Sequence, residues 1–554
     1  MFGAGGGTSS YREVQETDLL ILWGSNARET HPIFFHHVLK AVHRGASLHV
    51  VDPRRTGSAQ WADTWLGLDV GTDIALANTV AREIIHAGLA NEAFVKRATS
   101  GFAEYQASVE RWTLEEGERV TGVPAQTIRE LAHAYARAER AILCWTLGIT
   151  EHVTAVDNVL SLINLALLTG HVGRYGSGLN PLRGQNNVQG GGDMGAIPNK
   201  LPGFQDVEDE HTRGRFEAAW EAKLPPKHGW HLSQMFEAME RGELRTLYVL
   251  GENPAQSEAD SKKSLALLEG LDFLIAQDIL MTKTCEMADV VLPSSASWCE
   301  AEGGTVTNSE RRVQRMHKAI DPPGLARDDN WTIGELARRL GHDWGHPTVE
   351  QVWDECRSLS PMHRGMSYAR LEEMGGLQWP CPSEDHPGSL FLHGRLWEDP
   401  IEGPPATFSV TSWAPPVDAL DEEFPIRLTT GRRLDSYNTG VQSNLYSSPL
   451  RRGETLDLSP EDAKSLHVQP GELVQISSRR GSIEAPVRVD LGLRPGLAFM
   501  TMHFPDDIDV NVLTIDATDP KSGTAEFKAT AVRVEKLNGN GRATAVVASG
   551  EAGA

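Results

Sequence analysis

The chain has 554 residues and a net charge of −23, with 52 basic against 75 acidic side chains. This length exceeds what one hydrophobic core can serve and suggests about three or four domains. The acidic balance argues against nucleic acid, which requires clustered Lys and Arg. No apolar run approaches the roughly 18 to 20 residues of a membrane span, and the N-terminal residues do not resemble a signal peptide. A soluble, cytoplasmic protein is expected.

The cysteines are scattered, and no two of them form a Cys-x-x-Cys pair. This spacing offers neither an iron–sulfur cluster nor a zinc site, so no residue of this chain is predicted to bind a metal. We interpret them as neutral thiols in a reducing compartment. They are Cys144, Cys285, Cys299, Cys356 and Cys381.

Two stretches of the sequence predict the same βαβ unit. In the first, the apolar run DLLILWGSN at 18–26 is followed by a helical pattern at 32–45 and a second apolar run at 47–56. In the second, RTLYVLGENP at 245–254 is followed by a helical pattern at 261–271 and an apolar run at 272–282. Each first strand ends in Gly-x-Asn, and each second strand ends in Asp.

The spacing within the two units is nearly the same. Asp52 lies 28 positions after Gly24, and Asp278 lies 27 positions after Gly251. A strand-end Gly turn with an acid after the next strand is how doubly wound sheets bind a dinucleotide, so two similar ligands are implied. Neither unit has the full G-x-G-x-x-G of simple nicotinamide or flavin binding. The repeated positions are Gly24 and Gly251, Asn26 and Asn253, Asp52 and Asp278, Thr56 and Thr282, Ala62 and Ala288, and Asp63 and Asp289.

The alternative is an old duplication that serves folding alone, with Asp63 and Asp289 capping helices or turns. Between the repeats, helical patterns at 72–88, 125–141 and 155–173 predict helices that cover a sheet. The fold class expected is α/β, with two related doubly wound α/β domains followed by a C-terminal β-barrel. The predicted boundaries are 1–184 and 185–400 for the α/β domains, 401–424 for a Pro-rich linker, 425–538 for the barrel and 539–554 for a disordered tail.

The stretch NPLRGQNNVQGGGDMG at 180–195 combines one Arg with many amides and glycines. Glycines let backbone N–H groups approach a ligand, and Gln and Asn offer paired donors and acceptors to a heterocycle. A solvated surface loop is the simpler interpretation, but it does not explain the glycines. The stretch therefore predicts a binding site for something flat and polar.

At this point the sequence resembles the molybdopterin oxidoreductases and, within them, the formate dehydrogenase α subunits. The resemblance covers nearly the whole chain, and its most specific motif is RGQNNVQG at 183–190. It implies two pterin guanine dinucleotides on one molybdenum or tungsten, each held by one α/β domain and both capped by the barrel. It also implies oxidation of formate to CO2, with electrons passing to an iron–sulfur chain.

The resemblance assigns the cofactor-binding residues by position. An Asp at a strand end accepts paired hydrogen bonds from guanine, and the adjacent Gly lets a pyrophosphate reach backbone N–H groups. The family often has His-Tyr-His where this chain reads Ser436-Tyr437-Asn438, which puts contacts at 436 and 438 in doubt. The first nucleotide is assigned Gly24, Asn26, Asp52, Arg54, Gly71 and Asp73; the second Gly251, Asn253, Gln277, Asp278 and Asp329; the pterin Gln185; and the barrel contributes Arg432, Asn511, Phe527 and Lys528.

Arg183 is the predicted catalytic residue, because a guanidinium offers the paired donors that hold a small carboxylate such as formate. Two alternatives remain open. One is a molybdopterin enzyme for another substrate, such as nitrate, for which the Arg-Gly-Gln-Asn-Asn run has no obvious use. The other is a non-catalytic scaffold subunit of the same fold.

The family begins with a [4Fe–4S] domain, followed by a selenocysteine or cysteine that ligates the metal and an adjacent histidine. This chain, which starts at MFGAGGGTSS, matches the family only from a point just beyond that ligand. A UGA selenocysteine codon read as a stop would produce such a start. We therefore expect a downstream portion that is inactive alone and acts with an N-terminal part or an iron–sulfur electron-transfer subunit.

Overall fold

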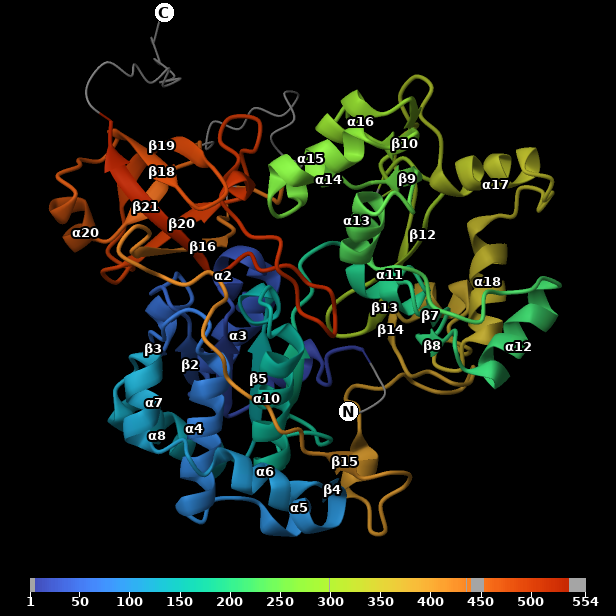
Figure 1. The fold of residues 1–554 in the computed structure, drawn as a ribbon. Helices are drawn as coiled ribbons and strands as arrows, with labels where there is room; N and C mark the ends of the chain where they lie inside the picture. The colour runs from blue at the N-terminus through green and yellow to red at the C-terminus, as the bar shows by residue number, and fades with distance from the viewer. Residues whose placement is uncertain (1–4, 298, 435, 440–452, 538–554) are drawn as a thin grey trace, which may run out of the picture.

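The computed structural model describes residues 5–297, 299–434, 436–439 and 453–537; the predicted tail lies outside this range. We use the predicted boundaries as names: the first lobe (5–184), the second lobe (185–400), the strap (401–424) and the barrel (425–537). Figure 1 shows the first lobe below, with the barrel and the second lobe side by side above it. Within the described ranges, no helix is both long and apolar enough to cross a membrane.

The first lobe is built on a five-stranded parallel sheet in the order β3-β2-β1-β5-β6. Its central strands are continuous apolar runs, as expected when both faces of a parallel sheet are buried. Leu19, Ile21 and Trp23 enter one core, and Leu20 and Leu22 enter another on the opposite face. The strands are β1 (Leu19–Trp23), β2 (Ser47–Val51), β3 (Thr64–Leu66), β5 (Ala141–Trp145) and β6 (Gly178–Pro181).

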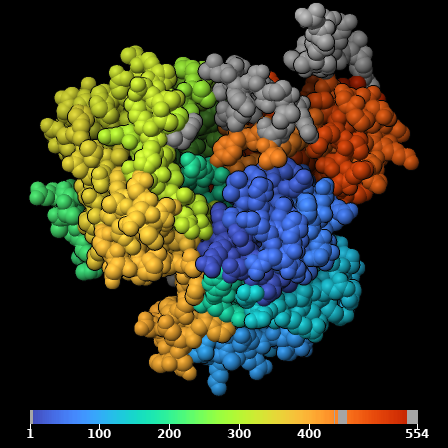
Figure 2. Space-filling view, turned by 180° about the vertical axis from the view of Figure 1, so that it is seen from behind, coloured from blue at the N-terminus to red at the C-terminus, as the bar shows by residue number. Residues whose placement is uncertain are grey.

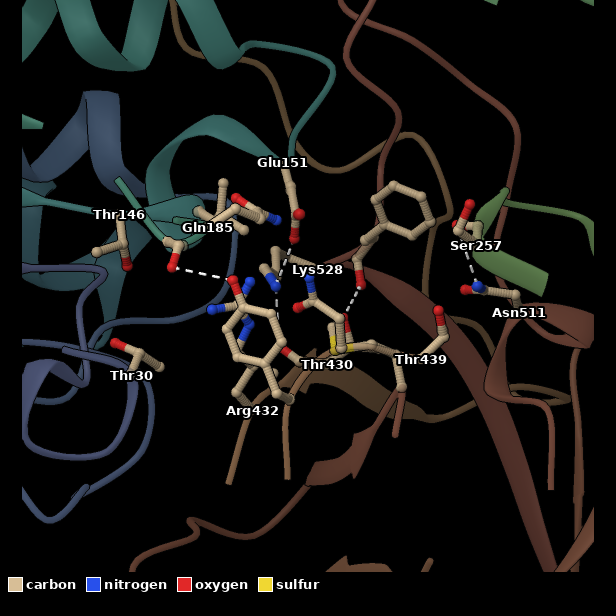
Figure 3. Close-up of a pocket in the computed structure, with 18 of the residues that line it drawn as sticks. Thr30, Thr146, Glu151, Gln185, Ser257, Thr430, Arg432, Thr439, Asn511 and Lys528 are labelled. Carbon is tan, nitrogen blue, oxygen red and sulfur yellow. Dashed lines mark hydrogen bonds and ion pairs between the residues drawn. The ribbon is translucent and has the colours of Figure 1, made fainter. Parts of the chain in front are cut away.

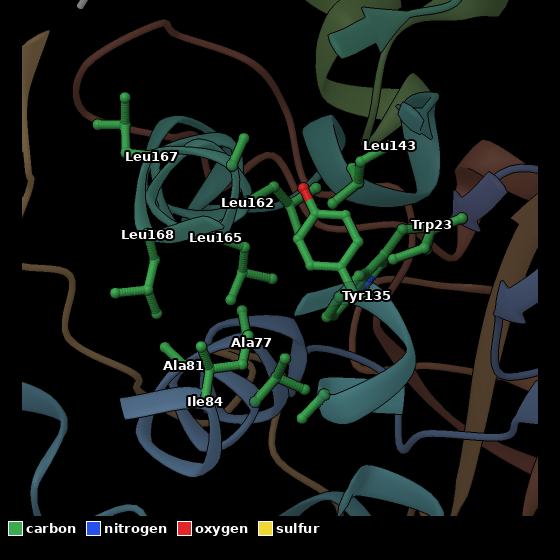
Figure 4. Close-up of a cluster of buried hydrophobic side chains, with 14 of the residues drawn as sticks. Trp23, Ala77, Ala81, Ile84, Tyr135, Leu143, Leu162, Leu165, Leu167 and Leu168 are labelled. Carbon is green, nitrogen blue, oxygen red and sulfur yellow. The ribbon is translucent and has the colours of Figure 1, made fainter. Parts of the chain in front are cut away.

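Helices cover both faces of this sheet. On one face, α4 and α10 pack through residues at helical spacing, as Figure 4 shows for Ala77, Ala81, Leu162 and Leu165 beside Trp23. The helices are α1 (Tyr11–Glu16), α2 (Ala27–Thr30), α3 (Pro32–His43), α4 (Asp73–His86), α5 (Glu92–Ala98), α6 (Phe102–Val109), α7 (Leu114–Thr121), α8 (Ala125–Arg137), α9 (Leu147–Thr150) and α10 (Ala155–Thr169). The predicted βαβ unit and the three predicted helices are confirmed.

The second lobe contains the second predicted βαβ unit, now in a three-stranded parallel sheet of order β11-β10-β9. An antiparallel sheet, β12-β13-β14, follows it. The strands are β7 (Lys200–Leu201), β8 (Gln205–Asp206), β9 (Thr246–Leu250), β10 (Phe273–Asp278), β11 (Val290–Pro293), β12 (Gly304–Thr307), β13 (Arg312–Met316) and β14 (Leu377–Gln378). The helices are α11 (Val188–Asp193), α12 (Glu210–Trp220), α13 (Leu232–Glu240), α14 (Pro254–Ser257), α15 (Ser261–Glu269), α16 (Lys283–Met287), α17 (Asp329–Arg339), α18 (Val349–Leu359) and α19 (Tyr368–Glu373).

The two faces of this smaller sheet differ. Leu274 and Ala276 of β10 are buried, and Leu247, which pairs with Leu274, packs with residues of α14, α15 and α16. On the other face, Leu250 is 41%, Phe273 39% and Val290 38% exposed, whereas Gln277 of the same face is buried. The register places these side chains on one face, because paired residues of parallel strands point the same way.

The end of the second lobe returns to the start of the chain. The Leu392 N–H donates to the Thr8 carbonyl at 2.9 Å, and Arg311 is fully buried against backbone carbonyls that include Gly7, at 2.6 Å. Figure 2 shows this segment, in gold, directly against the N-terminal residues in blue.

The strap lies along the first lobe. Its strand β15 (Ala406–Thr407) pairs with β4 (Thr99–Ser100), and Phe408 stacks on Tyr105 within the main core. Figure 1 shows the strap, in orange, running the length of the first lobe before it enters the barrel. The predicted linker is therefore a packed segment in its middle part.

The predicted barrel is confirmed as a closed barrel in the order β16-β20-β17-β19-β18-β21. Closure removes the sheet edges, and alternating residues such as Val474 and Ile476 fill the interior. Its elements are β16 (Ile426–Gly431), β17 (Leu456–Leu458), α20 (Pro460–Ser465), β18 (Leu473–Ser477), β19 (Ser482–Val489), β20 (Leu497–Thr501), the 3₁₀ helix η4 (Val510–Val512) and β21 (Thr530–Lys536).

Candidate active site

A cavity of about 1070 Å³ opens where the first lobe, the second lobe and the barrel meet. All three contribute walls, and the volume lies at the upper end of the range for pockets that hold one drug-sized ligand. It collects most of the residues predicted from the sequence. Those that line it are Gly24, Asn26, Asp52, Arg54, Gly71, Asp73, Gln185, Gly251, Asn253, Asp278, Arg432, Asn511, Phe527 and Lys528.

The first Gly turn closes the end of β1. Gly24 has a φ of +57°, and a Cβ there would lie 2.8 Å from a backbone carbon of Gly148, so only glycine fits. Its N–H donates to the Val51 carbonyl at 2.8 Å. Asn26 Oδ1 accepts from the Ser58 N–H at 3.3 Å and from its hydroxyl at 3.1 Å.

The second Gly turn repeats these bonds. Gly251 has a φ of +66°, and its N–H donates to the Gln277 carbonyl at 2.9 Å. Asn253 Oδ1 accepts from the Thr284 N–H at 3.2 Å and from its hydroxyl at 2.8 Å. A Cβ at Gly251 would meet no atom within 4 Å, so this turn faces open space. The repeat in the sequence is thus a repeat of hydrogen bonds.

The two strand-end acids are also equivalent. Asp52 Oδ1 accepts from the Arg54 N–H at 2.9 Å, and Asp278 Oδ1 accepts from the corresponding Leu280 N–H at 3.2 Å as well as from the Ile279 N–H at 2.7 Å. Among the described residues, Oδ2 of each acid has no hydrogen-bond donor. Burial raises the pKa of Asp52 to about 6, opposed by the Arg54 cation, and burial also raises the pKa of Asp278. Each turn therefore presents one acceptor oxygen to the cavity.

Asp63 and Asp289 have a structural role in both units. Asp63 Oδ2 accepts from the Leu48 N–H at 2.9 Å, and Asp289 Oδ2 accepts from the Leu274 N–H at 2.8 Å. Each acid fixes the amide near the start of the preceding strand, away from the cavity. The duplication therefore carries both folding contacts and cavity-facing groups.

Lys528 joins the barrel to the first lobe across the cavity wall. Its Nζ lies 2.6 Å from Glu151 Oε2 and donates to the Thr430 carbonyl at 3.1 Å, as Figure 3 shows. Both side chains are largely buried, at 8% and 15% exposure. On the opposite side, Asn511 donates to the carbonyl of Ser257 at 3.4 Å, which ties the barrel to the second lobe.

The neighbouring residues add further contacts between the barrel and the first lobe. His152 Nδ1 lies 3.0 Å from Glu526 Oε1, and the Phe527 N–H donates to the Glu151 carbonyl at 3.3 Å. Burial alone would lower the pKa of His152, but the Glu526 and Asp73 carboxylates raise it above its ordinary value. Burial likewise opposes ionisation of Glu526, and the imidazolium brings the net pKa of that carboxyl below its ordinary value.

Two arginines at the wall are held by aromatic rings. The guanidinium carbon of Arg54 lies 3.5 Å from the Phe499 ring centroid, and that of Arg432 lies 4.8 Å from Tyr437. The Tyr437 hydroxyl donates to the Gly184 carbonyl at 3.2 Å. Tyr437 and Asn438 line the cavity, so the stretch that departs from the family pattern still reaches it.

Arg183 lies beside the cavity rather than in its wall, between the lining residues Leu182 and Gly184. Its Nε–H donates to Gln189 Oε1 at 3.0 Å, and Nη2 donates to the Gly5 carbonyl at 2.8 Å. Burial lowers the pKa of its guanidinium, opposed by the Asp193 carboxylate. Its assignment as the formate-binding residue stays a prediction.

Gln277 and Asp329 also lie behind the wall. Gln277 Nε2 donates to Asp329 Oδ1 at 2.6 Å, and Gln277 is 1% exposed. The pair therefore links the second sheet to the start of α17, and its assignment to a nucleotide also stays a prediction.

Several lining residues carried no signal in the sequence. Thr146 donates to the Gly24 carbonyl at 2.7 Å, and the His31 ring Nε2–H donates to the Arg183 carbonyl at 2.8 Å. Burial lowers the pKa of His31 to about 4, and the Arg432 cation adds to this shift, so the ring is neutral at pH 7. Lys283, on the second lobe, adds a cation. Only tertiary contacts bring these residues to the cavity, and sequence spacing does not record them.

Two protein families match this chain. The family described as "Molybdopterin oxidoreductase" matches residues 4–339, and that described as "Molydopterin dinucleotide binding domain" matches residues 426–531. The second match coincides with the barrel, and the first spans the first lobe and most of the second.

Individual proteins are similar over nearly the whole chain. F420-dependent formate dehydrogenase 2 subunit alpha of Methanococcus maripaludis is 40% identical over 97% of this chain and 79% of its own length. Formate dehydrogenase H of Escherichia coli is 37% identical over 97% of this chain and 75% of its own length. Acetylene hydratase from Pelobacter acetylenicus has the same fold, with a TM-score of 0.73 at 20% identity, over 96% of this chain and 79% of that one.

Proposed function

Because this chain belongs to the molybdopterin oxidoreductase family, we propose that it oxidises formate to CO2 with a pair of pterin guanine dinucleotides on molybdenum or tungsten. The observation that carries the proposal is the repeated Gly turn and acid, one set from each lobe, facing a single cavity. Two like ligand halves that meet at one point require this arrangement. The formate dehydrogenase names of the similar proteins support the choice of substrate.

The chemistry of the wall fits two nucleotide-bearing groups. Asp52 and Asp278 each keep an acceptor oxygen for guanine N–H donors. The turn at Gly251 leaves open space in which a phosphate can reach backbone N–H groups. Ile279 and Met281 of the second lobe are 43% and 64% exposed at the cavity, and they offer apolar surface to a flat ring system.

The cations of the wall fit two pyrophosphates, although carboxylates outnumber them in the same lining. Cations line the cavity from all three parts of the molecule, so anionic phosphate oxygens gain paired hydrogen bonds as they lose water. Lys528 is already paired with Glu151. Its Nζ therefore serves first to hold the barrel in place. The lining cations are Arg54, Lys283, Arg432 and Lys528.

Arg183 is proposed to hold formate. A guanidinium presents paired donors to a carboxylate and fixes its plane, so the C–H bond of formate points in one direction. When bound, the metal with its pterins would supply the acceptor for the two electrons and the proton that leave formate as that C–H bond breaks. The substrate loses its charge when it becomes CO2, so its attraction to Arg183 falls and the product leaves. We propose that the electrons then pass to an iron–sulfur partner, which the family resemblance supports.

The test is the exchange of Arg183 in the metal-loaded enzyme. Arg183→Ala is expected to lower kcat/KM for formate by at least about 100-fold, since a charge-assisted paired contact contributes roughly 3 kcal/mol or more. Arg183→Lys should lose nearly as much, because an ammonium cannot form the paired contact. Wild-type kcat/KM in Arg183→Lys, at unchanged metal and pterin content, would show that Arg183 does not bind formate.

A further inference from the structure

A series of hydrogen bonds between buried side chains starts at the Arg183 guanidinium. Arg183 Nε–H donates to Gln189 Oε1 at 3.0 Å, and Gln189 Nε2 donates to Asp193 Oδ1 at 2.8 Å and to the Gly5 carbonyl at 3.2 Å. The indole N–H of Trp379 donates to Asp193 Oδ2 at 2.7 Å. Gln189 and Asp193 stand one turn apart on α11, and the three residues beyond the arginine are at most 2% exposed.

The direction of donation along this series of hydrogen bonds is fixed by the residues at its two ends. Arg183 and Trp379 are donors only, and an ionised Asp193 is an acceptor only. The Gln189 amide must therefore turn its oxygen to Arg183 and its NH2 to Asp193. A flipped amide would set NH2 against the guanidinium and its oxygen against the carboxylate. The Gln189 amide therefore has one allowed orientation. Its oxygen in turn fixes the direction of the Arg183 Nε–H bond.

The hydrogen bonds of Arg183 leave one edge of its guanidinium for a ligand. Nε is occupied by Gln189, and Nη2 donates to the Gly5 carbonyl at 2.8 Å. In the part of the chain that the structure describes, Nη1 has no hydrogen-bond partner. Two fixed nitrogens define the plane of the group, so the direction of the remaining N–H bonds is set before a ligand arrives.

The position of Asp193 is costly for folding alone. A carboxylate without exposed surface, held by an amide and an indole, loses more hydration than neutral donors restore. Burial raises the pKa of Asp193 to about 6, and the Arg183 and Arg311 cations oppose that shift. An apolar residue between Gln189 and Trp379 would serve packing better. The carboxylate therefore indicates that the orientation of the amide is what matters.

We propose that Gln189 and Asp193 are positioning residues for Arg183, which fix the plane of its guanidinium for a small carboxylate substrate. This inference rests on the proposed function, because it assumes that Arg183 binds formate. Neither residue touches the substrate. Both act through the arginine.

Three variants of the metal-loaded enzyme test this series of hydrogen bonds. Gln189→Leu removes the acceptor from Arg183, and Asp193→Asn places a donor against either Gln189 or Trp379. Each is expected to raise the formate KM at least about tenfold, the loss of one charge-assisted hydrogen bond, with a smaller change in kcat. The double variant Q189E/D193N reverses the central hydrogen bond and keeps the contacts of Arg183 and Trp379: Arg183 still donates to a carboxylate, and Trp379 still donates to an amide oxygen. It loses the hydrogen bond from Gln189 Nε2 to the Gly5 carbonyl, so its KM should recover in part and fall below that of either single variant.

The control is Asn164→Leu, which removes another buried amide with two hydrogen bonds, to Ser409 at 2.7 and 3.0 Å. It should lower the thermal unfolding temperature without changing the formate KM. The dissociation constant of formate by calorimetry, the pterin content and the unfolding temperature are measured for every variant.

The outcomes separate the two proposals. If Arg183→Lys raises the formate KM but Gln189→Leu and Asp193→Asn do not, the positioning role is wrong and the proposed function stands. If Arg183→Lys also leaves KM and the dissociation constant unchanged, formate binding by Arg183 itself fails. If both single variants raise KM and the KM of Q189E/D193N is no lower than theirs, packing rather than hydrogen-bond direction holds the arginine, which overturns the inference.

Discussion

The sheets of the two lobes have the same βαβ unit at their centre but different surroundings. In the first lobe, strand β1 is buried along its whole length, between two hydrophobic clusters. In the second lobe, Leu250, Phe273 and Val290 are exposed on one face of the sheet. Yet the Gly turns and the Asn contacts of the two lobes match bond for bond.

The geometry of the Gly turn and the burial of the sheet have different physical sources. The turn geometry depends on a positive φ at Gly and on an amide that bonds one short segment, so it is set locally. The burial of a sheet depends on which layers the rest of the chain places over it. A ligand-binding turn can therefore be kept while the covering layer of its sheet is changed.

The largest expected effect contrasts one aliphatic residue from each sheet, on the corresponding face. Ile21→Ala should cost about 3 kcal/mol of unfolding free energy, because it opens a cavity in a filled core. Leu250→Ala should cost less than about 1 kcal/mol, because its side chain is already partly hydrated. Denaturant unfolding measures both values. Equal losses would mean that the exposed face is covered in solution.

An intermediate effect compares the two acids at the cavity. Asp52→Ala and Asp278→Ala should each weaken pterin retention, by about tenfold or more in affinity, since a buried base loses a charged acceptor. The loss should be greater for Asp52, which is the more buried of the two. Pterin and guanine nucleotide released per chain after desalting give the measurement.

The structural acids provide the matched control for that pair. Asp63→Ala and Asp289→Ala remove hydrogen bonds within the same two units, away from the cavity. They should lower stability and keep the pterin content. Full pterin content in both Asp52→Ala and Asp278→Ala would show that all four acids are structural.

The smallest effect concerns how each lobe holds the barrel. The first lobe uses the buried His152–Glu526 pair, whereas the second uses neutral contacts and the partly exposed Lys263–Asp516 pair. The pKa of folded His152 lies above 6.5, so its contribution to stability is complete below 6.5 and is lost as pH rises through the folded value. The pKa of Glu526 is depressed, so its contribution is present above 4.5 and is lost as pH falls through the folded value.

Stability should therefore fall as pH rises above 6.5 and through the folded pKa of His152. His152→Gln should flatten this slope, and Lys263→Gln should not. Thermal unfolding at a series of pH values checks both variants. A slope that persists in His152→Gln would place the titrating group elsewhere.

Much of the fold could be predicted because its signals are local. The Gly-x-Asn ends of the strands, the acid about 28 positions later and the alternating strands after residue 425 each depend on a few neighbouring residues. These patterns located the two βαβ units and the barrel. They also located most of the cavity wall, because ligands bind at the carboxyl ends of parallel strands.

The rest depends on contacts between distant segments. Lys528 pairs with Glu151, and His31 bonds the carbonyl of Arg183, but nothing in their local sequence records these partners. Gln277 and Asp329 follow a family pattern, yet they bond each other behind the wall. The Pro-rich composition of the strap suggested a free linker, whereas Phe408 inserts into the core of the first lobe. Composition describes a segment and does not reveal the surface it meets.

The joint between residues 151–153 and 526–528 has a consequence for how the protein is made. The ribosome synthesises the chain from its N-terminus, so the first Gly turn exists long before the residues that close the cavity above it. Glu526, Phe527 and Lys528 come near the end of the described chain, and without them the cavity lacks one wall. A cofactor can be enclosed only after translation of the barrel is complete. Closure of the cavity is therefore a late step in the synthesis of the protein.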